Sequence, residues 1–108
     1  EWLRFCASEQ GETDLDAARL HGMSPFIGTS LDPTLRSLGV STVVATGVSL
    51  NVGILGMTIE AINHGYHVVL VTDCVTGYPP EYAEQVLQNS LKRITTQTTA
   101  EDLQKLWS

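Results

Sequence analysis

Apolar and polar positions follow a regular strand and helix pattern from residue 40 onward. Short apolar, β-branched runs predict strands at 42–46, 66–72 and 94–97. Periodic apolar positions predict helices at 52–64, 79–92 and 100–107. Strands that alternate with helices at this spacing form right-handed βαβ units on a parallel sheet. The pattern therefore predicts an α/β fold.

The first forty residues carry a weaker pattern. It fits one or two helical turns at 1–7 and an acidic loop at 8–14. A weak strand is expected at 15–20, and a turn at 21–26. Thr29 or Ser30 is expected to cap a short helix at 31–38, and Gly39 is expected to end it. Residues 1–13 are thus interpreted as a poorly defined leader, and the domain with a recognisable sequence pattern runs from 14 to 108. Because the chain starts with Glu1 instead of methionine, Glu1 is interpreted either as a processing boundary or as the end of an expressed fragment.

The junction between the strand at 42–46 and the following helix is the most informative stretch. Gly47 is expected to end the strand, and Asn51, directly before the helix, is expected to be the N-cap. Ligands bind at such carboxyl strand ends in open α/β sheets, because free backbone N–H groups and the helix dipole point into the crevice. Enzymes often place a serine or cysteine there, whereas this chain has Gly53.

The predicted sheet is small for a parallel fold. It has three clear strands and a doubtful one, and each edge strand would present a row of unpaired backbone groups. We therefore expect the chain to be the second half of a domain whose amino-terminal strands come from elsewhere.

Length and charge narrow the class of protein. The 108 residues suffice for one modest core, with 43% hydrophobic and 17% charged residues. Six basic residues stand against 12 acidic ones, a net charge of −6, and the basic residues are scattered, so no nucleic-acid partner is expected. No apolar run approaches the roughly 20 residues of a membrane span, and no secretory signal is visible. A cytoplasmic protein without a membrane partner is the resulting expectation.

The cysteines and histidines suggest neither a disulfide framework nor a metal. The two cysteines, Cys6 and Cys74, are too few and too far apart in the sequence to form a disulfide framework. We therefore expect a reducing compartment. The three histidines at 21, 64 and 67 lack zinc-ligand spacing with the cysteines. We expect no metal and no cofactor.

Several separate segments resemble the isochorismatase-like (cysteine hydrolase) superfamily. They are Ser24-Pro25-Phe26-Ile27-Gly28-Thr29-Ser30-Leu31-Asp32, Leu35-Arg36-Ser37-Leu38-Gly39-Val40, Val43-Val44-Ala45-Thr46-Gly47-Val48, Ala61-Ile62-Asn63-His64-Gly65-Tyr66 and Val71-Thr72-Asp73. The resemblance covers the chain from about residue 14 to its end. It implies a three-layer α/β fold in which a six-stranded parallel sheet is flanked by helices.

The resemblance also implies hydrolysis through an Asp, Lys and Cys triad, of which this chain carries no member. The aspartate would lie before Glu1, the lysine position falls on Leu20 beside Arg19, and the cysteine position falls on Gly53. By analogy with serine hydrolases, loss of the nucleophile from such a triad costs on the order of 10⁶-fold in rate.

A backbone cradle remains under the same resemblance. The family oxyanion hole maps to the N–H groups of Ser49 and Gly53, and the Val48–Ser49 peptide bond would be cis. The predicted pocket therefore comprises Ser49, Gly53, Val48, Asn51 and Phe26.

Each further candidate residue has an ordinary structural role as its alternative. Ser49 is either a substitute nucleophile or a backbone hydrogen-bonding partner, and Cys74 is either reactive or a small buried hydrophobe. His21 either lines the pocket or occupies a turn. Asp73 either serves function or accepts from loop N–H groups, and Phe26 either touches a ligand or packs in the core.

Three functions stay open at this point. The first is a hydrolase-family protein with impaired catalysis that binds a ligand or serves assembly. The second is an active hydrolase of small amides, esters or vinyl ethers that uses non-family groups or residues from a missing half. The third is a non-enzymatic interaction module, as a homo-oligomer or with a missing amino-terminal half as partner.

Overall fold

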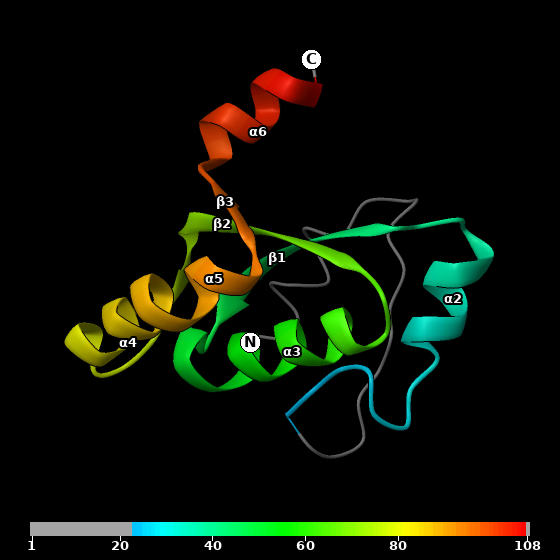
Figure 1. Ribbon diagram of the computed structural model, residues 1–108, viewed down its shortest axis with the longest axis horizontal. Helices are drawn as coiled ribbons and strands as arrows, with labels where there is room; N and C mark the ends of the chain where they lie inside the picture. Colours follow the sequence, from blue (N-terminus) through cyan, green and yellow to red (C-terminus); the bar gives the residue numbers. More distant parts are fainter. Residues whose placement is uncertain (1–22, 108) are drawn as a thin grey trace, which may run out of the picture.

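The computed structural model describes residues 23–107 and contains a three-stranded parallel sheet flanked by helices (Figure 1). Strands β1 (Thr42–Val48), β2 (His67–Thr76) and β3 (Thr96–Thr98) lie side by side in this order. The predicted α/β fold with a parallel sheet is confirmed. The expected helical turns at 1–7 and the weak strand at 15–20 lie outside the described residues.

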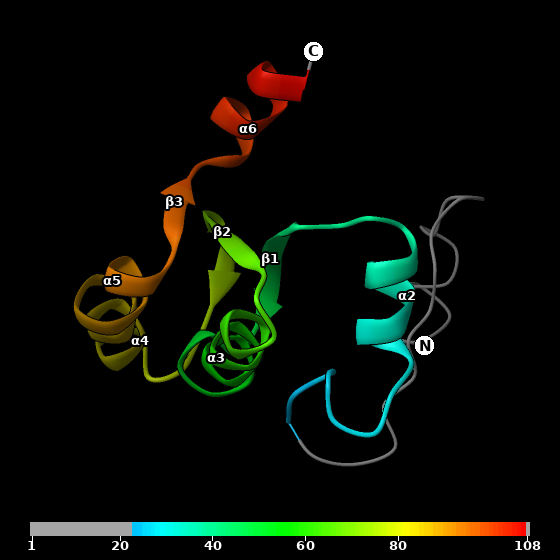
Figure 2. The same cartoon turned by 45° about the vertical axis from the view of Figure 1, so that its right-hand side comes forward.

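The helices follow the predicted order. One of them begins with a π-helical turn, and another contains a π-helical turn in its middle. The helices are α2 (Leu31–Ser37), η1 (Leu50–Ile54) leading into α3 (Leu55–Asn63), then α4 (Pro80–Val86), η2 (Leu87–Leu91) and α5 (Lys92–Ile94) in succession, and α6 (Ala100–Trp107). Figures 1 and 2 place α3 and α4 next to each other beside the sheet, while α6 extends away at the end of β3. No residue of α6 from Ala100 to Trp107 is buried.

The core lies between the sheet and the helices that follow β1 and β2. Val68 and Leu70 of β2 are almost fully buried, and they pack in one cluster with Ala45 of β1, Ala61 of α3 and Leu91 of η2. A central parallel strand is covered by its neighbours and by crossover helices, which explains the apolar run at 68–71. This core fixes the position of the loops that leave the carboxyl ends of β1 and β2.

The strands end later than the sequence pattern predicts. β1 continues through Gly47 to Val48, so the expectation that Gly47 ends the strand is wrong. The ladder pairs Ala45 with Leu70 and then resumes with Gly47 opposite Val75, which inserts a bulge into β2 and carries it to Thr76. Gly47 has φ +119°, a backbone conformation that favours glycine. Glycine here permits an irregular strand instead of terminating it.

The helix after β1 also begins earlier than predicted. Its N-cap is Ser49, and its first turn is the π-helical segment η1, so the expectation that Asn51 is the N-cap is wrong. The Ser49 carbonyl oxygen accepts hydrogen bonds from the N–H groups of Val52 (3.2 Å) and Ile54 (2.9 Å). The start of α6, by contrast, has a regular side-chain cap, since the Thr99 hydroxyl accepts from the Asp102 N–H at 3.2 Å.

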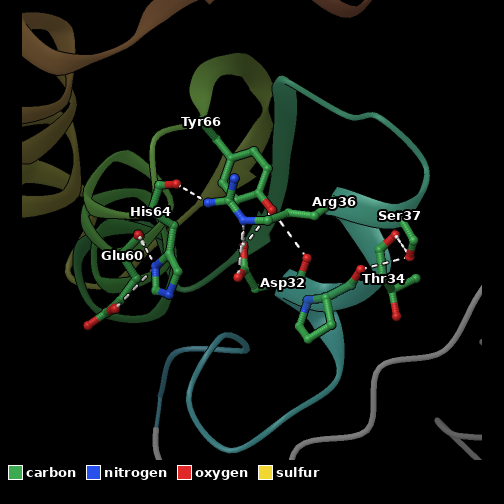
Figure 3. A network of polar contacts seen from close by, with 8 residues as sticks. Asp32, Thr34, Arg36, Ser37, Glu60, His64 and Tyr66 are labelled. Carbon is green, nitrogen blue, oxygen red and sulfur yellow. Dashed lines mark hydrogen bonds and ion pairs between the residues drawn. The ribbon is translucent and has the colours of Figure 1, made fainter.

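A polar network attaches α2 to the start of β2 (Figure 3). The Tyr66 hydroxyl donates to Asp32 Oδ1 at 2.6 Å, and Arg36 Nε lies 3.1 Å from the same oxygen. The Arg36 guanidinium carbon also stands 5.1 Å from the centroid of the Tyr66 ring, and the guanidinium donates to the His64 carbonyl. The hydrogen bond from Tyr66, which outweighs the opposing effect of burial, lowers the pKa of Asp32, and Arg36 acts in the same direction.

Tyr66→Phe is expected to lower stability in a pH-dependent way. Because the folded pKa of Asp32 lies below its unfolded value of about 3.9, its contribution is present above that pH and is lost as the pH falls through the folded pKa. Urea midpoints should therefore be lower for Tyr66→Phe than for the wild type at pH 6, and the two should converge below about pH 4. Tyr82→Phe, at an exposed tyrosine of α4, is the control. A difference between Tyr66→Phe and wild type that stays constant from pH 6 to 3 would contradict this role of Asp32.

Candidate functional site

The candidate site lies where β1 and β2 end at the same edge of the sheet. Val48, the last residue of β1, pairs with Thr76, the last residue of β2, so Ser49 and Gly77 leave the sheet as neighbours. The Val48–Ser49 peptide bond is cis, as the resemblance implies, and Tyr78–Pro79 is cis as well. Carboxyl ends of parallel strands are where open α/β sheets bind ligands.

Gly53 sits in the first helical turn after β1, within η1. Helical N–H groups in a first turn have no carbonyl one turn earlier, which favours binding of anionic or carbonyl oxygens. Outside its chain neighbours and its own helix backbone, the nearest described atom to a Cβ built on Gly53 is the Val48 carbonyl oxygen at 3.7 Å, an ordinary van der Waals distance. The packing of this half therefore accepts a side chain where the chain has none.

Ser49 and Asn51 form a side-chain bridge next to Gly53. The Ser49 hydroxyl donates to Asn51 Oδ1 at 3.1 Å, and Asn51 Nδ2 donates to the Tyr78 carbonyl at 3.2 Å. The Ser49 hydroxyl proton is thus directed at an amide oxygen, which is not a general base. This geometry favours the structural role of Ser49 over that of a nucleophile.

Four of the five predicted pocket residues come together, and the fifth lies elsewhere. Val48 is 70% exposed at the strand end, beside Ser49, Asn51 and Gly53. Phe26, in contrast, is buried and stacks on His64 with a ring separation of 5.3 Å. His64 follows the far end of α3, at the amino edge of the sheet, so Phe26 belongs to the core there. The predicted Leu20 position, Arg19 and His21 lie outside the described residues.

Asp73 and Cys74 lie on the bulged part of β2. Asp73 Oδ1 accepts from the Ala100 N–H at the start of α6 at 2.9 Å, so the structure gives Asp73 a backbone-acceptor role, as in the structural one of its two interpretations. Cys74 is exposed, so its expected burial is wrong, because the bulge turns this part of β2 to solvent. Within residues 23–107, no group of three His, Cys, Asp or Glu side chains could hold a metal ion. None of the helices in that range is long and apolar enough to cross a membrane.

The loop after β2 was not anticipated from the sequence. Asn51 of the first loop donates a hydrogen bond to the Tyr78 carbonyl of this second loop. Gly77 also borders a hollow of about 210 Å³, whose lining consists of Leu50, Thr72, Val75, Thr76, Gly77, Pro80, Ala83, Glu84 and Leu87. The available signal was the Gly77-Tyr78-Pro79 sequence directly after an apolar strand, which marks a turn at a strand end.

Comparison with known proteins decides the family. A model of the isochorismatase domain matches residues 14–102. The chain belongs to the isochorismatase family. The isochorismatase family protein YwoC of Bacillus subtilis, itself uncharacterized, is 34% identical over 103 residues, which are 94% of this chain and 54% of that protein.

Two further matches are an enzyme with a named activity and a protein with a solved structure. Maleamate amidohydrolase of Pseudomonas putida is 40% identical over 52 residues, 48% of this chain and 24% of that enzyme. The crystal structure of an isochorismatase-like hydrolase from Alkaliphilus metalliredigens superposes with a TM-score of 0.84 and 28% identity, covering 92% of this chain and 54% of the other. The chain thus spans about half the length of YwoC and of this structure.

Proposed function

We propose that this chain forms the carboxyl-terminal half of an isochorismatase-family ligand site that binds without covalent catalysis. In this proposal, the backbone N–H groups of Ser49 and Gly53 hold a carbonyl or carboxylate oxygen of a small ligand. The proposed role is ligand binding by a catalytically impaired family member.

The glycine at position 53 carries the proposal. A thiolate held at a helix amino end is the nucleophile that the family resemblance implies, and glycine offers none. Since a Cβ at this position would meet only ordinary contacts, the fold of this half gives no steric reason for the glycine. The strand end and the helical turn that would hold the nucleophile are nevertheless both formed.

Maleamate is the first probe, because one relative is named as its amidohydrolase. The chain is expected to gain a few degrees in melting temperature with millimolar maleamate, since a ligand that binds only the folded state stabilises it. It is expected to release no ammonia from maleamate above the buffer rate. Turnover that disappears in Ser49→Ala or Cys74→Ala would overturn the proposal, and so would the lack of any thermal shift with maleamate, esters or vinyl ethers.

A second candidate is hydrolysis that needs no protein nucleophile, and the room above Gly53 supports it. Vinyl ethers hydrolyse by protonation of carbon followed by addition of water, so a general acid suffices. Under this candidate, the acid comes from residues outside 23–107 or from another chain. Release of a carbonyl product from a vinyl ether, unchanged in Ser49→Ala and Cys74→Ala, would favour it over binding alone.

We also propose that another polypeptide segment covers the side of β1 that faces away from β2, which has no strand partner among residues 23–107. Within the described sheet, β1 pairs only with β2, and unpaired strand edges invite further pairing. A second copy of this chain or an amino-terminal half would satisfy this edge. The chain is expected to elute well above its monomer mass of 11.7 kDa and to unfold on dilution. A stable monomer whose unfolding does not depend on concentration would contradict this assembly.

A further inference from the structure

The loops after β1 and β2 are held in register at the candidate site. The bulge in β2 shifts its pairing so that Val48 meets Thr76, and the next residues, Ser49 and Gly77, start their loops together. If the register of Thr42–Ala45 continued without the bulge, Val48 would meet Asp73 and Gly77 would lie opposite Val52, past Ser49. The irregular strand thus brings Tyr78 to the level of the cradle.

Asn51 joins the two loops through both ends of its amide. Its oxygen accepts from the Ser49 hydroxyl at 3.1 Å, and its nitrogen donates to the Tyr78 carbonyl at 3.2 Å. Gly77 permits this approach, since a Cβ there would overlap Asn51 Oδ1 and would lie 3.0 Å from Ala83 Cβ. The contact therefore requires both an amide at 51 and a glycine at 77.

Tyr78 is placed by this bridge but has a free aromatic surface. Its backbone carbonyl is fixed by Asn51, while the residue as a whole is 82% exposed. A large aromatic side chain on a held backbone is suited to binding, because its ring offers contact area at low entropic cost and prefers to stack on planar groups.

We propose that Asn51 is a positioning residue that holds Tyr78 at the rim of the Ser49–Gly53 cradle, and that Tyr78 selects ligands with a planar ring. This inference rests on the proposed function, which supplies the cradle. Ser49 supports Asn51, and Gly77 makes room for it. The ligand class that this arrangement favours is a planar cyclic amide or carboxylate, whose oxygen would reach the cradle while its ring lies on Tyr78.

The first arm of the test needs no ligand. In the ¹⁵N-labelled full chain, the heteronuclear NOE of the Tyr78 amide is expected to match that of the helices. Asn51→Asp keeps the acceptor for Ser49 but removes the N–H donor, so the Tyr78 value should fall while α3 and β2 stay unchanged. Gly77→Ala should have the same local effect. Asn89→Asp, at an exposed asparagine of η2, is the matched control and should leave Tyr78 unchanged. An unaltered Tyr78 in Asn51→Asp would overturn the positioning role.

The second arm tests ring selection with benzamide and acyclic maleamate, using dissociation constants from NMR titration. Tyr78→Ala and Asn51→Asp are expected to weaken benzamide binding by roughly tenfold and maleamate binding by less than about twofold, the scale of one stacking contact or hydrogen bond. Equal losses for both probes in Tyr78→Ala would mean a merely structural role and overturn ring selection. If the wild type binds neither probe, the proposed function and ring selection both fail, while the first arm still decides the bridge.

Discussion

Replacing Gly53 with cysteine is expected to give a folded protein with an unusually acidic thiol at position 53. The backbone accepts the new Cβ, whose nearest described neighbour would be 3.7 Å away. In the first turn after β1, helical N–H groups stabilise the thiolate, and thiols at helix amino ends have pKa values below the usual value of about 8.5. Alkylation by iodoacetamide, followed by peptide mass mapping from pH 5 to 9, should give a midpoint about one pH unit below 8.5.

Gly56→Cys is the matched control for this experiment. Gly56 lies in α3, beyond the π-helical first turn η1, and a Cβ there has no neighbouring atom within 4 Å outside its own helix backbone. Its alkylation midpoint should stay near 8.5, since the N–H groups around it are paired in the helix. Equal midpoints for Gly53→Cys and Gly56→Cys would mean that position 53 has no special electrostatic environment. We expect ammonia release from maleamate to stay absent in Gly53→Cys, because the family resemblance places Leu20 at the lysine position.

Leu91→Ala is expected to cause a large loss of stability, since Leu91 is one of the most deeply buried side chains of the described core. Leu91 is fully buried at the end of η2 and packs in the cluster with Leu70 and Ala45. Truncation removes apolar contacts and leaves a cavity, which typically costs about 3 kcal/mol. Since small domains are stable by only about 5–15 kcal/mol, urea unfolding should shift strongly toward lower concentrations.

Leu106→Ala provides the comparison for that loss. Leu106 of α6 is 79% exposed, so its truncation should change the free energy of unfolding by less than about 0.5 kcal/mol. Similar losses for the two variants would mean that α6 is covered by a partner in solution. An unchanged Leu91→Ala protein would contradict the described core.

The order of strands and helices could be predicted because each element carries its own period. Val68 and Leu70 form part of an apolar run typical of a covered parallel strand, and Thr99 with Asp102 marks a helix start; both features are present in the structure. The place of Gly53 at the start of the helix after β1 could also be predicted, because an apolar run precedes it and helical periodicity follows it. These are local properties of short segments.

The details that depend on partners across the sheet could not be predicted. Gly47 was expected to end β1, but the ladder with β2 resumes beyond it and extends both strands. Asn51 fits an N-cap by its type and place, yet its amide binds the Tyr78 loop, which is 27 residues away. The family resemblance places Phe26 among the pocket residues. In the structure, however, its ring stacks on His64, away from the candidate site. Tertiary contacts override local preference at each of these residues.

The proposed ligand cradle consists of the backbone N–H groups of Ser49 and Gly53. Titration of the ¹⁵N-labelled full chain with maleamate tests this most directly, because each amide reports its own environment. If these N–H groups hold the ligand, saturable chemical-shift changes will be largest at the Ser49 and Gly53 amides, and the residues of α6 will be unaffected. Saturable changes centred elsewhere, or no change at Ser49 and Gly53 while the melting temperature rises, would contradict the proposed cradle.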